Sequence, residues 1–250
     1  LTPDALRELL NAYFSLATEV VHAHGGTLDK FIGDAVMAFW GAPLAQPDHA
    51  RRAVQAALAL AASAEPLNAQ LSSRGLPPVR FGIGVATGVV CVGDLGSQLR
   101  RSYTAVGDAV NLAARLEALT REAGVAVLVD EPTRHACDGA AQPWVWVEVD
   151  RCPIRGRQQP VTVFTPLPIT AGSAVTLEAQ VRTWHLAQAL ARQHHPQQAL
   201  AELAPLLSPA STTILPAVPT PLVPPALATL ATRLAHRLGH DAEGSPCNPP

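Results

Sequence analysis

Three short segments of the sequence combine glycine turns with charged or amide side chains, the residue types that bind anions and metal ions. The first contains Gly33-Asp34 between two β-prone stretches, Thr27–Ile32 and Ala35–Trp40. Two apolar runs around a two-residue break that contains glycine predict a hairpin. Asp34 would lie at its tip, where a carboxylate can bind a hard cation. Gly-Asp is also an ordinary turn dipeptide, so this segment alone leaves a purely structural role open.

The second segment, Tyr103–Glu117, predicts a helix that begins near Asp108 and carries Asn111 and Arg115. These two residues are four apart, so they lie one above the other on the same helix face. An amide beside a guanidinium can bind anions and sugar hydroxyls. The alternative is a solvated polar stripe in which Arg115 pairs with Asp108 or Glu117.

The third segment, Arg80–Gly88, is rich in glycine. Its spacing is GxGxxxG rather than GxGxxG, and a β-prone run follows it instead of a helix. Both features argue against a dinucleotide-binding turn. The glycines are expected to let a strand or a ligand approach the backbone closely.

The elements that must position these segments mix helical and β-prone patterns. Helices are expected at 2–25, 47–71 with an interruption at Pro66, 108–119 and 131–136, and strands at 27–32, 35–40, 79–86, 89–92, 125–129, 145–149 and 161–164. Strands and helices do not strictly alternate along the chain, and some consecutive strands form hairpins. The pattern therefore predicts an α+β fold with a largely antiparallel sheet flanked by helices.

The character of the chain changes near residue 167, which predicts a first domain at 1–167 and a tail at 168–250. Residues 177–207 form an Ala-, Leu- and Gln-rich helical stretch broken near Pro196. Residues 208–225 carry many prolines and predict an extended linker, and 226–238 predict one more helix. No chemistry is assigned to this tail.

Composition excludes several classes of protein. Hydrophobic residues make up 48% of the chain and the net charge is −2, which argues for a packed core and against a nucleic-acid partner. The four cysteines are scattered, so neither a metal site nor a disulfide framework is predicted, and a cytoplasmic location is expected. No apolar run is long enough to span a membrane, so no membrane contact by this segment is expected.

Taken together, the segments resemble one family. The runs DKFIGDAVMAFWGAP, RFGIGVATGVVCVGDLGS and YTAVGDAVNLAARLE, in this order, are similar to the class III adenylate/guanylate cyclase catalytic domain, and IRGRQQPVTVF resembles its closing basic segment. The resemblance covers about residues 1–167. It implies a ferredoxin-like cyclase fold.

The resemblance implies an activity and a set of roles. Members of this family bind a nucleoside triphosphate between two catalytic domains, usually of a homodimer, and two Mg²⁺ or Mn²⁺ ions assist attack of the ribose 3′-oxygen on the α-phosphorus. By motif, Asp34 is similar to a metal-binding aspartate, Asn111 to the ribose-orienting residue and Arg115 to the residue that stabilises the transition state. Arg80 and Arg155 resemble basic contacts to the triphosphate.

Lys30 and Thr104 resemble the pair that selects the purine base. A lysine donor can meet N1 of adenine, which is an acceptor, whereas guanine presents a donor there. Lys30 is the one lysine among 18 basic residues, which is consistent with a site that needs a compact ammonium. The resemblance therefore implies ATP as substrate and cyclic AMP with pyrophosphate as products, and it disfavours a guanylate cyclase.

One family feature is expected upstream of Leu1. Family domains open with a strand that carries the first metal-binding aspartate, and the present sequence starts within the helix that follows this strand. Without it the central sheet would have an unpaired edge. Two interpretations follow: an adenylate cyclase domain that is complete in a longer parent protein, or a non-catalytic cyclase-homology module for nucleotide binding or dimerisation.

Overall fold

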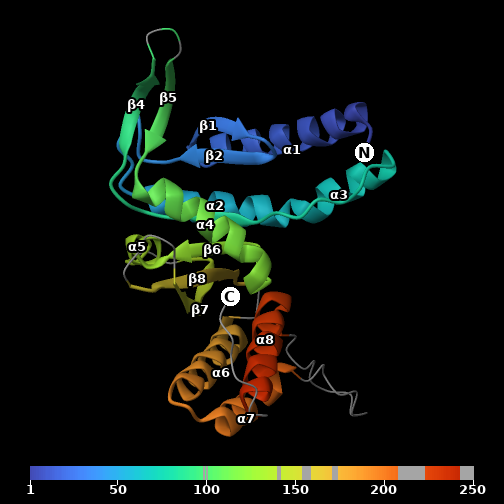
Figure 1. The fold of residues 1–250 in the computed structure, drawn as a ribbon, viewed down its shortest axis with the longest axis vertical. Coiled ribbons are helices and arrows are strands. Elements are labelled where there is room, and N and C mark those ends of the chain that lie inside the picture. The colour runs from blue at the N-terminus through green and yellow to red at the C-terminus, as the bar shows by residue number, and fades with distance from the viewer. Residues whose placement is uncertain are drawn as a thin grey trace. The chain divides into compact units, whose positions relative to one another are not determined.

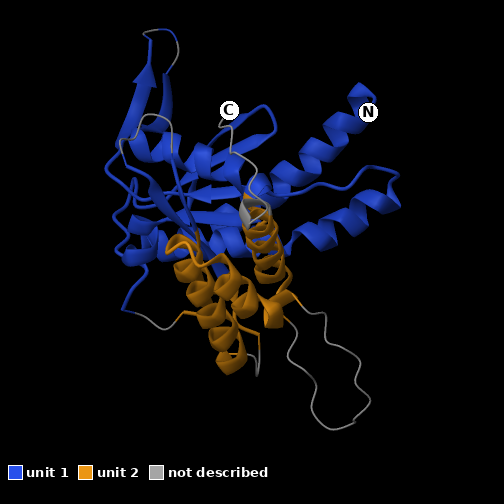
Figure 2. Ribbon diagram, turned by 60° about the horizontal axis from the view of Figure 1, so that its bottom comes forward, with its two compact units in different colours: residues 1–122, 126–140, 150–166 blue, residues 123–125, 141–149, 167–250 orange. Residues whose placement is uncertain are grey.

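The computed structural model describes residues 1–97, 99, 101–139, 142–153, 159–170, 174–207 and 223–242. The chain divides into two compact units: residues 1–122, 126–140 and 150–166 form the first, and residues 123–125, 141–149 and 167–250 form the second (Figure 2). The domain boundary at residue 167 stays a prediction.

Helix α1 (Pro3–Ala23) opens the first unit as the sequence predicts. The Thr2 hydroxyl accepts a hydrogen bond from Ala5 N at 3.3 Å, and Pro3 occupies the first turn, where its missing N–H costs nothing. Gly25 follows the helix with a φ of 69°, a left-handed conformation that favours glycine. The predicted start and end of this helix are confirmed.

Strands β1 (Thr27–Ile32) and β2 (Ala35–Phe39) pair antiparallel, which confirms the predicted hairpin, and Gly33 turns its tip with a φ of 64°. The pairing contains a β-bulge that the sequence did not reveal. Leu28 pairs with Ala38 and Lys30 with Met37, so Asp29 is an extra residue on β1.

An aromatic cluster holds this hairpin on α1. The rings of Phe14 and Phe31 stack with centroids 4.0 Å apart, and the rings of Tyr13 and Phe81 stack at 5.4 Å. Such pairs add to the free energy gained by area burial alone. The hairpin and the segment around Phe81 are therefore fixed to the same helix.

The Ala-rich helical stretch is broken at a different residue from the one predicted. Helix α2 (His49–Ala62) ends at Ser63 and α3 (Ala64–Ser73) starts there, whereas the interruption was expected at Pro66. Pro66 lies in the first turn of α3, where a proline removes no intrahelical hydrogen bond.

The main sheet has four strands in the order β3–β6–β8–β7: β3 (Ile83–Val85), β6 (Val127–Asp130), β8 (Val161–Pro168) and β7 (Trp144–Cys152). Strand β3 runs parallel to β6, and β6 antiparallel to β8, so the sheet is mixed. Among the described residues, β2 pairs only with β1 and β3 only with β6. The α+β class predicted from the sequence is confirmed.

A separate hairpin consists of β4 (Cys91–Gly96) and β5 (Arg101–Val106), and it projects from the rest of the first unit (Figure 1). The sequence predicted a strand at 89–92 and none at 101–106. Strand β5 leads into α4 (Asp108–Ala123), and α5 (Glu131–Ala136) follows β6. The predicted helices at 108–119 and 131–136 are confirmed.

Gly84 lets α4 lie against β3. A Cβ atom at this position would overlap the carbonyl oxygen of Ala113 and lie 2.5 Å from the backbone nitrogen of Glu117. A Cβ at Gly82 would likewise overlap the hydroxyl of Thr120. The close approach that the sequence predicted is therefore made by a helix and not by a neighbouring strand.

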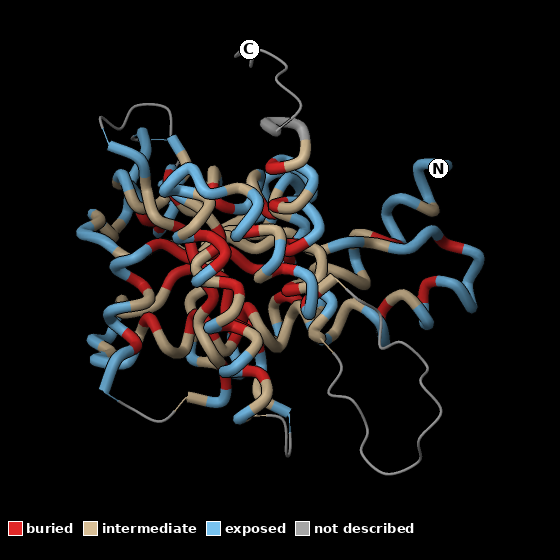
Figure 3. Tube along the Cα trace, turned by 90° about the horizontal axis from the view of Figure 1, so that it is seen from below, coloured by how far each residue is buried: buried red, intermediate tan, exposed pale blue. Residues whose placement is uncertain are grey.

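Strand β6 belongs to the core of the first unit, since its four residues are all buried. Figure 3 shows the buried stretches of the chain in red. Asp130 ends this strand with 1% of its surface exposed, and its carboxylate accepts hydrogen bonds from Thr133 N at 2.9 Å and Thr87 N at 3.3 Å. A buried carboxylate with donors on two sides is satisfied, so Asp130 has a structural role.

The second unit contains α6 (Ala174–Arg192), α7 (Pro196–Leu207) and α8 (Pro225–Ala242), which confirms the predicted helical tail with its break near Pro196. Residues 208–222 of the predicted linker lie outside the described residues. Within the part of the chain that the structure describes, no helix has the length and apolar character needed to cross a bilayer.

Helix α6 contacts the backbone of β7 through three side chains. Trp184 Nε1 donates to the carbonyl oxygen of Glu148 at 2.7 Å, and Gln188 Nε2 donates to that of Val149 at 2.7 Å. The backbone nitrogen of Glu148 donates to His185 Nε2 at 3.0 Å. Three backbone groups of β7 therefore bond to α6.

Candidate active site

The structure brings Lys30 and Thr104 into direct contact. Lys30 Nζ donates to Thr104 Oγ1 at 2.9 Å across 74 residues of sequence. Lys30 lies on β1 and Thr104 on β5, so the β1–β2 hairpin and the β4–β5 hairpin meet at this pair. The threonine is 6% exposed while the lysine side chain is 41% exposed, so the ammonium is open to a ligand.

A third residue of this group, Asp29, was missed by the sequence analysis. Its side chain is fully buried, and its Oδ2 accepts a hydrogen bond from Thr104 Oγ1 at 2.5 Å and one from Ala105 N at 3.2 Å. Its Oδ1 lies 3.3 Å from Lys30 Nζ as an ion pair without hydrogen-bond geometry. The sequence carried one clue: Asp29 lies next to Lys30, the one lysine of the chain, and a charged partner is what a buried carboxylate requires.

Asp34 lies at the turn of the β1–β2 hairpin and is exposed, as the sequence predicts. The charge of Asp34 affects Tyr13 on α1. The pKa of the Tyr13 phenol is raised above its usual 10.0, first by burial, then by the carboxylate of Asp34 and then by that of Glu117. Because Glu117 belongs to α4, the phenol of Tyr13 feels negative charge from the hairpin tip and from the helix that carries Asn111 and Arg115.

Asn111 and Arg115 lie four residues apart on α4, so they share a face of this helix. Asn111 is exposed and Arg115 is half-buried, while Leu112 and Leu116 on the same helix are buried. Gly84 faces the α4 backbone at Ala113 and Glu117, one before and one after Arg115 in the chain, so this contact fixes how closely α4 lies against β3.

The two remaining predicted site residues differ in what the structure shows of them. Arg80 is exposed and lies three residues before β3, next to Phe81 of the aromatic cluster. Arg155 lies outside the described residues, so its role stays a prediction.

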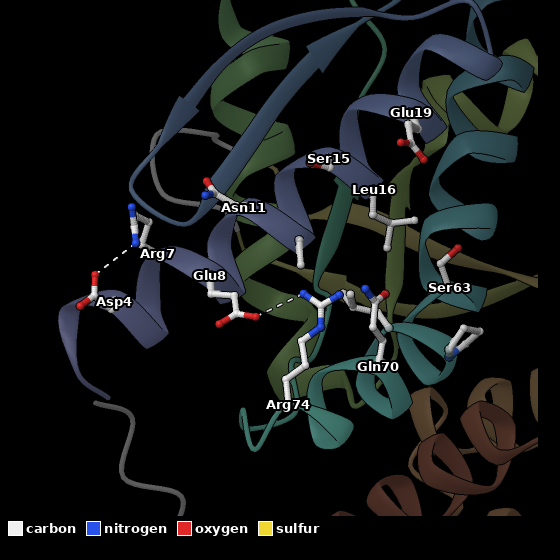
Figure 4. Close-up of a pocket in the computed structure, with 13 residues that line it drawn as sticks. Asp4, Arg7, Glu8, Asn11, Ser15, Leu16, Glu19, Ser63, Gln70 and Arg74 are labelled. Carbon is white, nitrogen blue, oxygen red and sulfur yellow. Dashed lines mark hydrogen bonds and ion pairs between the residues drawn. The ribbon is translucent and has the colours of Figure 1, made fainter.

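A hollow of about 880 Å³ between α1 and α3 contains none of the predicted site residues (Figure 4). Four of its five charged side chains form pairs, all except Glu19: Arg7 Nη2 lies 3.2 Å from Asp4 Oδ1, and Arg74 Nη1 lies 3.2 Å from Glu8 Oε1. These pairs are solvated, so they form a surface groove and not a reactive centre.

The residues that could hold a metal ion are few. Among the described residues, no group of three or more His, Cys, Asp or Glu side chains converges in a way that could hold an ion. Mg²⁺ is commonly bound by one or two carboxylates together with substrate phosphates. The exposed carboxylate of Asp34 fits that mode, in which the nucleotide supplies the other ligands.

Comparison with known proteins identifies the family. The adenylate and guanylate cyclase catalytic domain matches residues 1–165. Adenylate cyclase 1 of Rhizobium meliloti is 42% identical over 127 residues, which cover 51% of this chain and 19% of that protein. The terminal-differentiation-specific adenylate cyclase of Dictyostelium discoideum is 30% identical over 183 residues, 73% of this chain and 8% of that protein. The chain belongs to the adenylate and guanylate cyclase catalytic domain family, and it spans less than a third of the length of these curated relatives.

Solved structures agree with this assignment. The adenylyl cyclase CyaB from P. aeruginosa is 30% identical with a TM-score of 0.62, over 68% of this chain and 86% of that one. The guanylyl cyclase Cya2 is 31% identical with a TM-score of 0.61, over 69% and 85%. One of these structures is of an adenylyl cyclase and the other of a guanylyl cyclase, so the fold alone does not show which base a domain of this kind uses.

Proposed function

We propose that this chain is an adenylate cyclase domain that converts ATP to 3′,5′-cyclic AMP and pyrophosphate. The contact between Lys30 Nζ and Thr104 Oγ1 supports the proposal, because a donor and an oxygen side by side could form hydrogen bonds with the edge of a purine base. The lysine ammonium has donors and no acceptor. It therefore matches N1 of adenine and opposes the N–H at N1 of guanine.

In the proposed reaction the bond from the ribose 3′-oxygen to the α-phosphorus forms, and the bond from that phosphorus to the bridging oxygen of pyrophosphate breaks. The proton of the 3′-hydroxyl passes to solvent. Asn111 would hold the ribose, and the guanidinium of Arg115 would face the charge that develops on the phosphoryl oxygens. Arg80 would bind the triphosphate, and its exposed position leaves it open to an anion.

Asp34 would hold Mg²⁺ or Mn²⁺ together with the phosphates of the nucleotide. Such an ion neutralises phosphate charge and lowers the pKa of a bound hydroxyl. The position of Asp34 at a tight hairpin tip, with Gly33 in the left-handed conformation, leaves its carboxylate exposed to the incoming nucleotide.

A second copy of the domain is the proposed partner. Several large apolar residues of β1 and the β4–β5 hairpin are solvent-exposed in the single chain: Phe31 (43%), Ile32 (57%), Leu95 (37%), Tyr103 (41%) and Val106 (56%). Apolar groups of this kind, close to the proposed base-binding pair, favour a protein interface at the same place as the site.

The direct test measures products. The full chain is incubated with ATP or GTP and either Mg²⁺ or Mn²⁺, and cyclic AMP, cyclic GMP and pyrophosphate are quantified by chromatography. We expect cyclic AMP to form faster than cyclic GMP, and Arg115→Ala to serve as the inactive control. Faster formation of cyclic GMP would overturn the choice of base. Tight ATP binding without either product would favour the non-catalytic cyclase-homology module.

A further inference from the structure

The buried carboxylate of Asp29 controls which way the hydroxyl of Thr104 points. A threonine hydroxyl has one hydrogen and two lone pairs. A carboxylate only accepts, so the 2.5 Å contact between Thr104 Oγ1 and Asp29 Oδ2 uses the hydrogen of the threonine. Lys30 Nζ only donates, so its 2.9 Å contact uses one lone pair of the same oxygen. Thr104 is left with acceptor capacity alone.

The β-bulge explains how two consecutive residues reach the same threonine. Successive side chains of a regular strand point to opposite faces, so Asp29 and Lys30 would normally diverge. The register shift between Leu28 and Lys30 makes Asp29 the extra residue of β1 and turns its side chain. Asp29 and Lys30 consequently meet Thr104 together.

The resulting array has a fixed polarity that matches only one purine. Lys30 offers a donor, and beside it Thr104 offers an acceptor. Adenine presents an acceptor at N1 and an amino donor at C6, which complements this array. Guanine presents a donor at N1 and an acceptor at C6, which opposes it at both positions. A threonine whose hydroxyl could rotate would accept either base at C6.

We propose that Asp29 is a positioning residue that sets base specificity by fixing Thr104 as an acceptor next to the Lys30 donor. This inference rests on the proposed function, since it concerns how the same site chooses ATP. Asp29 does not touch the nucleotide in this scheme, because its side chain is fully buried behind Thr104 and Lys30.

The test is Asp29→Asn, which keeps the shape and removes the charge. If the amide oxygen faces Thr104, the amide nitrogen faces the Lys30 ammonium, and two donors oppose each other. If the amide is reversed, its nitrogen donates to Thr104, whose hydroxyl then turns outward as a donor. Either arrangement weakens discrimination, so the ratio of the GTP to the ATP dissociation constant should fall about tenfold or more.

A double-mutant cycle separates positioning from simple support of the fold. Binding of ATP and GTP is measured by competition with a fluorescent nucleotide for wild type, Asp29→Asn, Thr104→Val and the double variant. If Asp29 acts through Thr104, Asp29→Asn lowers the ratio in the wild-type background and changes it little in the Thr104→Val background. Asp138→Asn, the same change at an exposed carboxylate near His135, is the matched control.

The outcomes distinguish the inference from the proposed function. A wild-type protein that does not prefer ATP overturns the proposed choice of base. A wild-type preference that survives unchanged in folded Asp29→Asn overturns the positioning role alone. If Asp29→Asn does not fold, the wild type is tested with purine riboside triphosphate and its 6-methoxy derivative, which both keep an acceptor at N1. The 6-methoxy compound should bind more weakly, because its oxygen opposes the Thr104 acceptor; tighter binding would contradict the fixed polarity.

Discussion

Lys30 Nζ and Thr104 Oγ1 lie 2.9 Å apart although 74 residues separate them in the chain. This contact joins the β1–β2 hairpin to β5, and it places the one lysine of the chain next to a buried hydroxyl. The base preference of the domain can therefore be tested at a single position.

Lys30→Glu should weaken ATP use, because the new carboxylate presents an acceptor to N1 of adenine and lies beside the buried carboxylate of Asp29. We expect kcat/KM for ATP to fall at least about tenfold, the usual effect of a lost hydrogen bond to a charged group. In Lys30→Gln, which keeps a donor without the charge, kcat/KM for ATP should fall less. An ATP to GTP ratio that is the same in Lys30→Glu and wild type would refute the role of Lys30.

Arg115→Ala should lower kcat by roughly 10²- to 10³-fold while the KM for ATP changes less, since the guanidinium is assigned to charge that develops in the transition state. The matched control is Arg121→Ala, which removes an exposed arginine from the last turn of the same helix. The control should retain activity. Equal rates for Arg115→Ala and wild type would remove Arg115 from the chemical step.

Gly84→Ala should destabilise the first unit by about 1–3 kcal/mol, because the added methyl group overlaps the backbone of α4 and forces the helix away from β3. The free energy of unfolding is measured by urea denaturation. Gly93→Ala is the control, since a Cβ at that strand position meets nothing within 4 Å. Equal stability of the two variants would show that α4 is not in contact with β3 as described.

Asp34→Asn should lower the pKa of Tyr13, because it removes the second-largest cause of the raised value while burial remains. The phenolate absorbance reports this directly, since the chain has two tyrosines and Tyr103 can be subtracted with Tyr103→Phe. An unchanged titration would place the Asp34 carboxylate far from α1.

The same group predicts how stability depends on pH. The folded-state pKa of Tyr13 is raised above its usual 10.0, so the folded state holds this proton more tightly than the unfolded chain. The contribution of this proton to the free energy of unfolding is therefore fully present below pH 10.0, and it is lost as the pH rises through the folded-state pKa of Tyr13. Tyr13→Phe should flatten this alkaline loss in urea denaturation; an equal slope in both proteins would contradict it.

The elements that the sequence predicted well are those with a local cause. The period of apolar residues in α1, the glycine of the β1–β2 turn and the start of α4 at Asp108 are all readable from neighbouring residues. The break at Ser63, strand β5 and the mixed direction of the main sheet depend on contacts distant in sequence, so local patterns did not reveal them.

The candidate site divides in the same way. Five site residues could be predicted because their motifs match a known family: Lys30, Asp34, Thr104, Asn111 and Arg115. Asp29 was missed because strand alternation places it on the face opposite Lys30, and the bulge that turns it is set by the pairing with β2. The sequence shows only that an aspartate lies next to the one lysine of the chain, and the structure shows that this aspartate is buried.

The hydrogen bonds from α6 to β7 have a consequence for solubility. Strand β7 ends the order of the main sheet, and an edge strand with free N–H and C=O groups is a template for pairing with another chain. Trp184, His185 and Gln188 bond to three backbone groups of Glu148 and Val149, so these groups are not available to pair with another chain. A protein cut before Ala174 would lose α6 and leave these three backbone groups of β7 without their partners, so we expect it to aggregate more readily than the full chain.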